Sequence, residues 1–197
     1  NDNCMDTGFL TTPFLLDALC KIGRRDLAYE MLWQEKIPSW LSEVKAGATT
    51  IWENCFGYDA EGNPGNLSFN HYSFGAVGQW MITRSLGIVR ETPGFRSFTL
   101  RPMPDEGKRV TEAHGWYLSP CGKIESSWKA ITDGYEYQFA VPANTNCILE
   151  LPGSEAAVIR ESGTMPESAE GCKPLGYNGG CHRFDLASGT YSFTVIN

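Results

Sequence analysis

The side chains best suited to chemistry in this sequence form two clusters that lie close together along the chain. Glu53 follows the apolar and aromatic pair Ile51-Trp52, and the polar-aromatic cluster Asn70-His71-Tyr72 lies about 18 residues later. Aromatic faces stack on the apolar side of a sugar ring, while amides, imidazoles and carboxylates hydrogen-bond its hydroxyl groups. The combination is typical of a sugar-binding site.

Glu53 also has the chemistry to act on such a sugar. Hydrolysis of a glycosidic bond with inversion needs a protonated carboxyl group for the leaving oxygen and an ionised carboxylate that activates water on the opposite face. Glu53 fits either role. On residue types alone, a plainer interpretation stays open: Glu53 is a solvated charge, His71 caps a helix, and Trp52 fills a core.

These clusters lie in a long connection between elements with helical periodicity. Thr12 and Pro13 begin a predicted helix that stops at Gly23, and residues 26–34 form a second one packed antiparallel to it. A third is expected over residues 72–86, with Phe74, Val77, Trp80 and Met81 facing inward. The intervening 37–71 is far longer than the usual connection of about two to eight residues. A connection of this length usually has a function.

The periodicity changes after Pro93-Gly94 from helical to that of short strands separated by turns. Asp133-Gly134 and Ser188-Gly189 have the composition of hairpin turns. Eight strands without intervening helices predict an antiparallel β-sandwich over residues 94–197. The expected strands are 95–100, 112–118, 123–131, 136–141, 147–151, 157–160, 182–186 and 191–196.

Length and composition narrow the class of protein. With 197 residues, 42% of them hydrophobic and 20% charged, the chain is globular and large enough for one to two domains. The net charge of −7 argues against a nucleic-acid partner, which needs clustered positive charge. No apolar run reaches the roughly 20 residues that cross a bilayer, so no membrane partner is expected.

The seven cysteines do not have the spacing of a metal site. None of them forms a C-x-x-C pair, so structural zinc is not expected, and nothing else in the sequence calls for a metal or a cofactor. Cys172 and Cys181 bracket a loop rich in glycine, proline and asparagine, which a disulfide could close in an oxidising compartment.

Several strings of the sequence together resemble one enzyme family. Gly47-Ala48-Thr49-Thr50-Ile51-Trp52-Glu53 and the later Ser68-Phe69-Asn70-His71-Tyr72-Ser73-Phe74-Gly75-Ala76-Val77 resemble the C-terminal part of the bacterial α-L-rhamnosidases of glycoside hydrolase family 78. Shorter strings resemble the same family in the same order, among them Thr7-Gly8-Phe9, Pro38-Ser39-Trp40, Pro93-Gly94-Phe95, Gly122-Lys123-Ile124 and Val141-Pro142-Ala143-Asn144-Thr145. The resemblance covers nearly the whole chain.

The resemblance implies an α+β multidomain architecture. Residues 1–93 would be the C-terminal helices of an (α/α)6 catalytic barrel, and residues 94–197 an antiparallel, jelly-roll-like β-sandwich. It also implies an inverting enzyme that releases terminal, non-reducing α-L-rhamnose. In that family the glutamate of the first string is the general base, here Glu53. The histidine of the second string touches the bound sugar, here His71, and Trp52 and Asn70 would shape the pocket.

One part of the family pattern has no counterpart in these residues. The family's general acid belongs to an acidic motif in the first half of the barrel, and neither Asp2 nor Asp6 has its context. We therefore expect a fragment that is inactive alone, with the rest of the barrel as its partner in a longer chain. The substrate would be a rhamnose-containing oligosaccharide, polysaccharide or glycoside. A homo-oligomer is an open alternative, and a signal peptide on the longer chain would make it periplasmic or secreted.

Two other functions compete with this interpretation. In the first, the sandwich is a carbohydrate-binding or structural module without catalysis, with Trp116, Tyr117, Trp128, Tyr135 and Tyr137 as candidate stacking residues. Alternation places Trp116 and Leu118 on one face of their strand and Trp128 inward with Ser126 and Ala130, so most of the five aromatic side chains are expected in the core. In the second, the chain belongs to another (α/α)6-barrel glycosidase or a phosphorylase.

Overall fold

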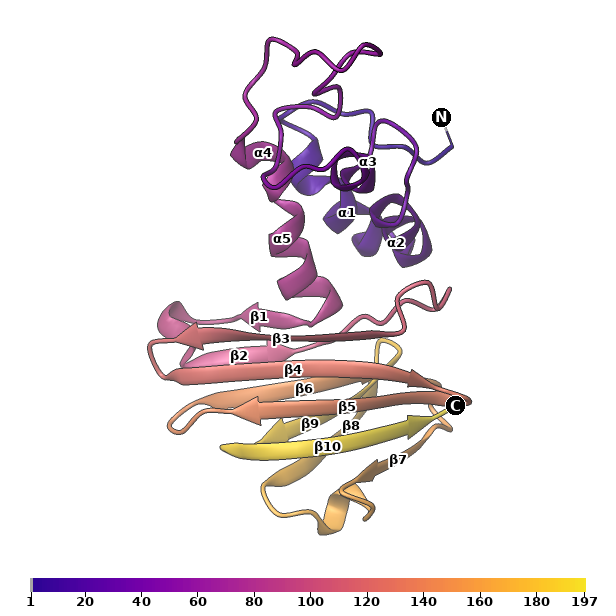
Figure 1. Ribbon diagram of the computed structural model, residues 1–197. Helices are drawn as coiled ribbons and strands as arrows, with labels where there is room; N and C mark the ends of the chain where they lie inside the picture. Colours follow the sequence, from indigo (N-terminus) through magenta and orange to yellow (C-terminus); the bar gives the residue numbers. More distant parts are fainter. Residues whose placement is uncertain (1) are drawn as a thin grey trace. The chain divides into compact units, whose positions relative to one another are not determined.

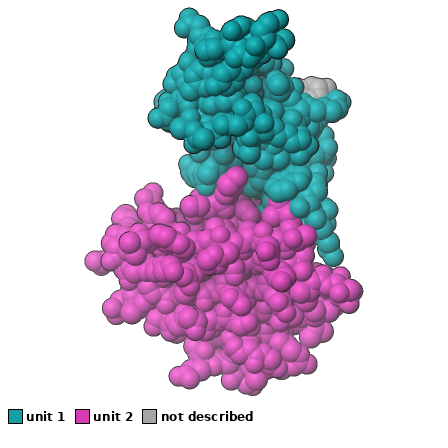
Figure 2. Space-filling model, viewed as in Figure 1, with its two compact units in different colours: residues 1–80, 105–109 teal, residues 81–104, 110–197 magenta. Residues whose placement is uncertain are grey.

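The computed structural model describes residues 2–197 and divides into two compact units. One consists of residues 1–80 and 105–109, and the other of residues 81–104 and 110–197 (Figure 2). The compact units thus separate between Trp80 and Met81. The domain boundary near residue 93 stays a prediction.

The first unit is built from short helices. They are α1 (Thr12–Lys21), α2 (Arg25–Leu32), α3 (Trp40–Lys45), α4 (Tyr72–Gly75) and α5 (Val77–Trp80), and the helical path continues into the second unit as a π-helical turn over Met81–Ser85 (Figure 1). The two predicted N-terminal helices are confirmed. The third predicted helix is present but is interrupted at Ala76 and widened after Trp80.

Helix α3 was not predicted, because it lies inside the long connection and has only six residues. Its start is specified locally: the Ser39 side chain accepts a hydrogen bond from the Ser42 backbone N–H, and the Ser39 N–H donates to the Ser42 hydroxyl. This capping box satisfies two backbone donors that the helix itself leaves unpaired. The Trp40 indole N–H then donates to the Phe74 carbonyl at 2.9 Å and ties α3 to α4.

Aromatic side chains dominate the core of the helical unit. Tyr29 packs edge-on against Trp80 at 5.1 Å between ring centroids, and both side chains are buried. The inward expectation for Met81 was wrong, since its side chain is 41% exposed, and Phe14 of α1 is 68% exposed. In α1 the buried side chains are Thr12 and Leu16 instead.

The second unit is a sandwich of two five-stranded sheets (Figure 1). The first sheet has the order β1 (Ile88–Arg90), β2 (Ser97–Leu100), β6 (Asn146–Pro152), β9 (Cys181–Leu186), β8 (Cys172–Asn178). The second has the order β3 (Glu112–Ser119), β4 (Gly122–Ile131), β5 (Gly134–Val141), β10 (Gly189–Ile196), β7 (Val158–Glu161). Short 3-10 turns lie at Pro93–Phe95 and Pro166–Ser168.

The strands pack their alternating apolar residues between the two sheets, as period-two patterning requires. The largest fully buried side chains include Phe98, Leu149, Trp128, Tyr137 and Phe193, from both sheets. Burial of Trp128 confirms the inward place that alternation predicted for it. Trp116 and Leu118 share one face of their strand as predicted, but that face is outward: they are 54% and 67% exposed.

The sandwich departs from the sequence prediction in its connections. All eight predicted strands are present, and β1 and β8 are additional, at the two edges of one sheet. Strands β2 and β6 run parallel, whereas every other pair is antiparallel within the residues described. Asp133-Gly134 turns between the paired strands β4 and β5, but Ser188-Gly189 leads from one sheet to the other and so is not a hairpin turn.

The proposed disulfide is also ruled out by register. Strands β8 and β9 form a hairpin in which Cys172 lies opposite Leu186 and Cys181 lies opposite Asn178. The two cysteines are therefore at opposite ends of the hairpin, too far apart for a disulfide bond. Across residues 2–197 no disulfide is formed.

Candidate functional site

Two stretches of the long connection that are distant in sequence run beside each other and join the predicted site residues. The Glu53 N–H donates to the Ser68 carbonyl, and the His71 N–H donates to the Ile51 carbonyl, each at 2.8 Å. The Thr50 hydroxyl also donates to the Phe69 carbonyl. These bonds bring residues 50–53 alongside 68–71, so the two predicted clusters lie next to each other.

The Glu53 carboxylate lies at this junction and is half-buried. Its Oε2 atom accepts a hydrogen bond from the Ser68 backbone N–H at 2.7 Å. Glu53 and Ser68 therefore bond twice, once through the Glu53 backbone and once through its side chain. This double attachment fixes the direction of the carboxylate while leaving the side chain in partial contact with solvent.

His71 is held in one orientation by its neighbours. Its ring stacks with that of Phe9 at 4.7 Å and with that of Tyr72 at 5.1 Å between centroids. Its Nδ1 atom accepts the Ser73 backbone N–H at 3.3 Å at the start of α4. A neutral imidazole that accepts at Nδ1 carries its proton on Nε2. His71 thus presents a hydrogen-bond donor at Nε2, and the helix cap that composition suggested is present as well.

Trp52 and Asn70, the other two predicted residues, occupy different environments. Trp52 is only 4% exposed, and its ring packs edge-on against Tyr58 and Phe69 at 5.5 and 5.3 Å. In this arrangement the buried Trp52 ring packs under residues 58–69 of the connection and supports them. Asn70 is exposed at the surface, and its backbone carbonyl accepts the Ser68 hydroxyl at 3.1 Å.

A second carboxyl group, which the sequence analysis did not single out, lies beneath this segment. Glu43 on α3 is 2% exposed; its Oε2 accepts the Trp52 backbone N–H at 3.2 Å and its Oε1 accepts the Cys55 thiol at 3.3 Å. Burial raises the pKa of the Glu43 carboxyl, and these hydrogen bonds offset only part of the shift. Glu43 and Trp40 lie three residues apart, and this spacing would have placed Glu43 inward had α3 been recognised.

The structure provides no evidence of a metal centre. Within residues 2–197, no three or more His, Cys, Asp and Glu side chains are grouped so that they could bind a metal ion. A membrane-crossing helix, which needs about 20 apolar residues, is likewise not found in the described part of the chain.

Both parts of the chain match known protein families. Residues 1–84 match the profile described as bacterial alpha-L-rhamnosidase 6 hairpin glycosidase domain, and residues 87–165 match the bacterial alpha-L-rhamnosidase C-terminal domain. The two matches meet near the division between the helical unit and the sandwich, which identifies the class as a glycosidase-type helical domain followed by its β-domain. The chain belongs to the bacterial α-L-rhamnosidase family.

Individual relatives agree with this assignment. The chain is 34% identical over 186 residues to an alpha-L-rhamnosidase of Streptomyces avermitilis and 39% identical over 162 residues to one of Formosa agariphila. These alignments include 92% and 81% of the chain but only 18% and 17% of the relatives. The chain therefore spans about a fifth of the length of the curated relatives that it matches.

Solved structures show the same fold. The crystal structure of Streptomyces avermitilis alpha-L-rhamnosidase complexed with L-rhamnose superposes with a TM-score of 0.85 at 31% identity, over 98% of this chain and 18% of that one. The alpha-L-rhamnosidase from Dictyoglumus thermophilum gives 0.86 at 25% identity, over 100% of this chain and 22% of that one. Both confirm the prediction of helices followed by a β-sandwich.

Proposed function

We propose that this chain is the C-terminal portion of an inverting α-L-rhamnosidase in which Glu53 is the general base. The substrate class is a glycoside with terminal, non-reducing α-L-rhamnose. The observation that carries the proposal is the pairing of residues 50–53 with 68–71, since it joins a fixed carboxylate to a fixed imidazole N–H donor. The family membership and the named relatives support the same substrate.

The proposed reaction uses one water molecule. The Glu53 carboxylate accepts a proton from water while the water oxygen attacks the anomeric carbon of rhamnose. The bond from that carbon to the leaving oxygen breaks, and a general acid, which the resemblance places outside this chain, donates a proton to the oxygen. His71 donates a hydrogen bond from Nε2 to a rhamnose hydroxyl, and Trp52 and Asn70 maintain the shape of the loop.

The test is substitution of Glu53 in the full-length enzyme. Glu53→Gln keeps the shape of the side chain but cannot accept the proton, so we expect kcat for an aryl α-L-rhamnoside to fall by about a hundredfold or more. Glu61→Gln, an exposed glutamate of the same connection, is the matched control and is expected to keep normal activity. A Glu53→Gln enzyme with near-normal turnover would refute the assignment.

The same assay tests the expected inactivity of the separate chain. Both carboxyl groups act as a unit, so the 197-residue chain without the general acid is expected to release no aglycone above the uncatalysed rate. Turnover by the chain that is lost in Glu53→Gln would show that the second carboxyl lies within these residues.

A further inference from the structure

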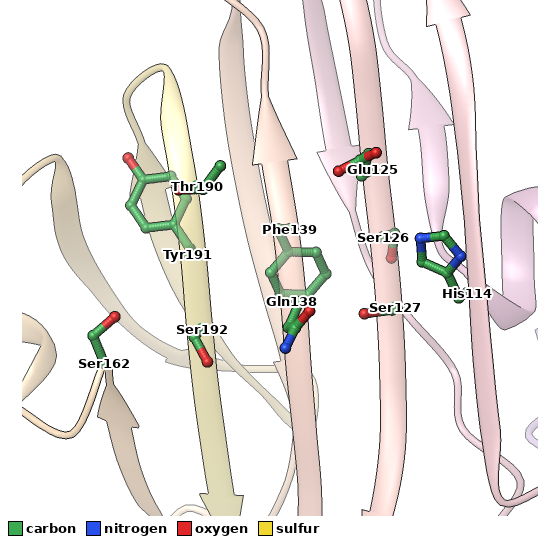
Figure 3. A pocket seen from close by; sticks show the side chains of 10 residues that line it. All are labelled: His114, Glu125, Ser126, Ser127, Gln138, Phe139, Ser162, Thr190, Tyr191 and Ser192. Atoms are coloured by element: carbon green, nitrogen blue, oxygen red, sulfur yellow. The ribbon is translucent and has the colours of Figure 1, made fainter.

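The outward face of the sheet β3-β4-β5-β10-β7 carries an ordered row of polar side chains. His114 on β3 lies opposite Ser127 on β4, Ser127 lies opposite Gln138 on β5, and Gln138 lies opposite Ser192 on β10. Figure 3 shows these side chains side by side across four strands. Their sequence neighbours Trp128, Phe139 and Phe193 are buried, so the row faces away from the core.

This row is the floor of a hollow in the sheet surface. The hollow has a volume of about 280 Å³, and its lining also includes Glu125, Ser162 and Thr190 (Figure 3). A second hollow of about 550 Å³ shares His114, Ser127 and Gln138 with the first. The two hollows therefore adjoin along the row.

The lining has the chemistry of a site for a polyhydroxylated ligand. A primary amide, an imidazole and several hydroxyl groups can both donate and accept hydrogen bonds, as sugar hydroxyls require. Trp116 stands on the same face of β3 as His114, two residues along, and its ring is 54% exposed. Such a ring beside a polar row gives the apolar side of a sugar a surface to stack on.

The charges on this face favour a neutral ligand. Lys123 forms an ion pair with Glu125 and lies over the Trp116 ring, 5.6 Å from its centroid. Lys129 lies 4.0 Å from Glu112. Each of these lysines therefore has a glutamate partner, and Glu136 adds another negative charge to the lining. An anionic sugar, phosphate or nucleic acid would meet net repulsion here.

We infer that this outward face of the sandwich, centred on Ser127 and Gln138 with Trp116 at its edge, binds a neutral oligosaccharide. The site lies in the sandwich, whereas Glu53 and His71 belong to the helical unit. It does not depend on the proposed hydrolysis. A substrate-holding surface of this kind adds affinity for a saccharide chain without adding a catalytic group.

The experiment is calorimetric titration of the 197-residue chain with three probes. These are a neutral α-L-rhamnose oligosaccharide, cellotetraose as a neutral chain of other sugars, and tetragalacturonate as an anionic one. We expect saturable binding of at least one neutral probe and none of tetragalacturonate. Gln138→Ala and Trp116→Ala are each expected to weaken that binding by about tenfold, the scale of one stacked ring or hydrogen-bonded amide.

Matched variants separate this site from the rest of the molecule. Trp33→Ala removes a tryptophan of similar exposure, 48%, from the helical unit, and Asn178→Ala removes an exposed amide from the other sheet; both are expected to bind as the parent chain does. His71→Ala, at the proposed rhamnose contact in the helical unit, reports any binding that takes place there and not on the sandwich. The inference is overturned if no neutral probe binds, if Gln138→Ala and Trp116→Ala bind normally, or if only His71→Ala abolishes binding. A Glu53→Gln enzyme with normal turnover would contradict the proposed function alone.

Discussion

The backbone around Glu53 is held in place by the buried carboxyl group of Glu43. Glu43 accepts hydrogen bonds from Trp52 and Cys55, the residues on either side of the segment that carries Glu53. A buried carboxyl is stable in this place when it is protonated or fully hydrogen-bonded, and burial here raises its pKa. The Cys55 thiol shares this environment, and burial together with its bond to Glu43 raises the pKa of Cys55 to about 12.

The raised pKa of Glu43 predicts a pH dependence of stability. A carboxyl group whose pKa is higher in the folded state favours folding most below the ordinary carboxyl value, and that contribution is lost as the pH rises through the folded-state pKa. The free energy of unfolding of the 197-residue chain should therefore fall relative to that of Glu43→Gln as the pH is raised from the ordinary carboxyl pKa upward. Urea unfolding, monitored by tryptophan fluorescence at each pH, measures the free energy of unfolding of the parent chain and of Glu43→Gln.

The control for this measurement is again Glu61→Gln, because Glu61 is exposed in the same connection. Its difference from the parent chain should not change with pH. A constant difference between the parent chain and Glu43→Gln over the same pH range would contradict the prediction.

At the level of residues, the sequence suggested candidate site residues but not the residues that support them. The types and spacing of Glu53 and His71 suggested a sugar site, and the structure joins the segments that carry them. Glu43 was not identified, because a glutamate in a short polar stretch has the composition of a solvated residue. The local capping box at Ser39 starts α3, and the buried Trp40 one turn before Glu43 marks the face of α3 that turns Glu43 inward.

Among the elements, strand β1 depends on a close backbone approach at Gly87. Gly87 has φ +72°, and a Cβ atom on it would lie 2.0 Å from the Arg101 carbonyl carbon and 2.2 Å from its oxygen. The Arg101 N–H donates to the Gly87 carbonyl at 2.8 Å just beyond the pairing of β1 with β2. A side chain here would have to push the two chain segments apart.

Gly87→Ala is therefore expected to destabilise the sandwich by more than about 2 kcal/mol, from left-handed backbone strain plus the clash. Gly94→Ala is the matched control, because Gly94 has the same φ of +72° and no atom within 4 Å of the added Cβ. It should cost only about 1 to 2 kcal/mol from strain. Thermal or urea unfolding compares the two, and equal losses would contradict the role of the close approach.

The elements that sequence patterning missed share a physical cause. Strand β8 contains Pro174 and Gly176, with a bulge between them, and its lack of alternation suggested a loop. As an edge strand it pairs on one side only, so these residues are tolerated. Strand β1 is also an edge and has three residues. Central strands such as β4 and β5, which pair on both sides, have the strict alternation that made them predictable.

For Trp116 the same alternation identified a face but not its direction. Period two places Trp116 and Leu118 on one side of β3, and their hydrophobicity suggested the core side. The neighbouring strand shows the opposite: Trp128 and Ile124 of β4 are buried, while Lys123 and Glu125 share the face of Trp116. Since apolar residues on a surface are common, only the register between strands decides such cases.

The molecule as a whole exposes apolar surface unevenly. On α1 and its flanks, Leu10, Phe14 and Ile22 follow one another at helical spacing and are 89%, 68% and 72% exposed. Side chains four residues apart, or eight, lie on the same side of a helix, so these three and the exposed Ala18 form one stripe. A surface of this kind in an otherwise water-exposed unit favours association.

We therefore predict that the 197-residue chain self-associates through this stripe. Sedimentation velocity over a range of concentrations should show species heavier than the 21.8 kDa monomer. Replacing Leu10, Phe14 and Ile22 together by glutamine should shift the mass distribution toward the monomer, because it removes the exposed apolar surface whose burial favours association. The matched control makes the same glutamine replacements at three exposed apolar residues of the sandwich. These are Val158, Met165 and Leu175, which are 51%, 50% and 43% exposed. A parent chain that stays monomeric at every concentration, or a control variant that loses association equally, would show that the exposed stripe does not drive assembly.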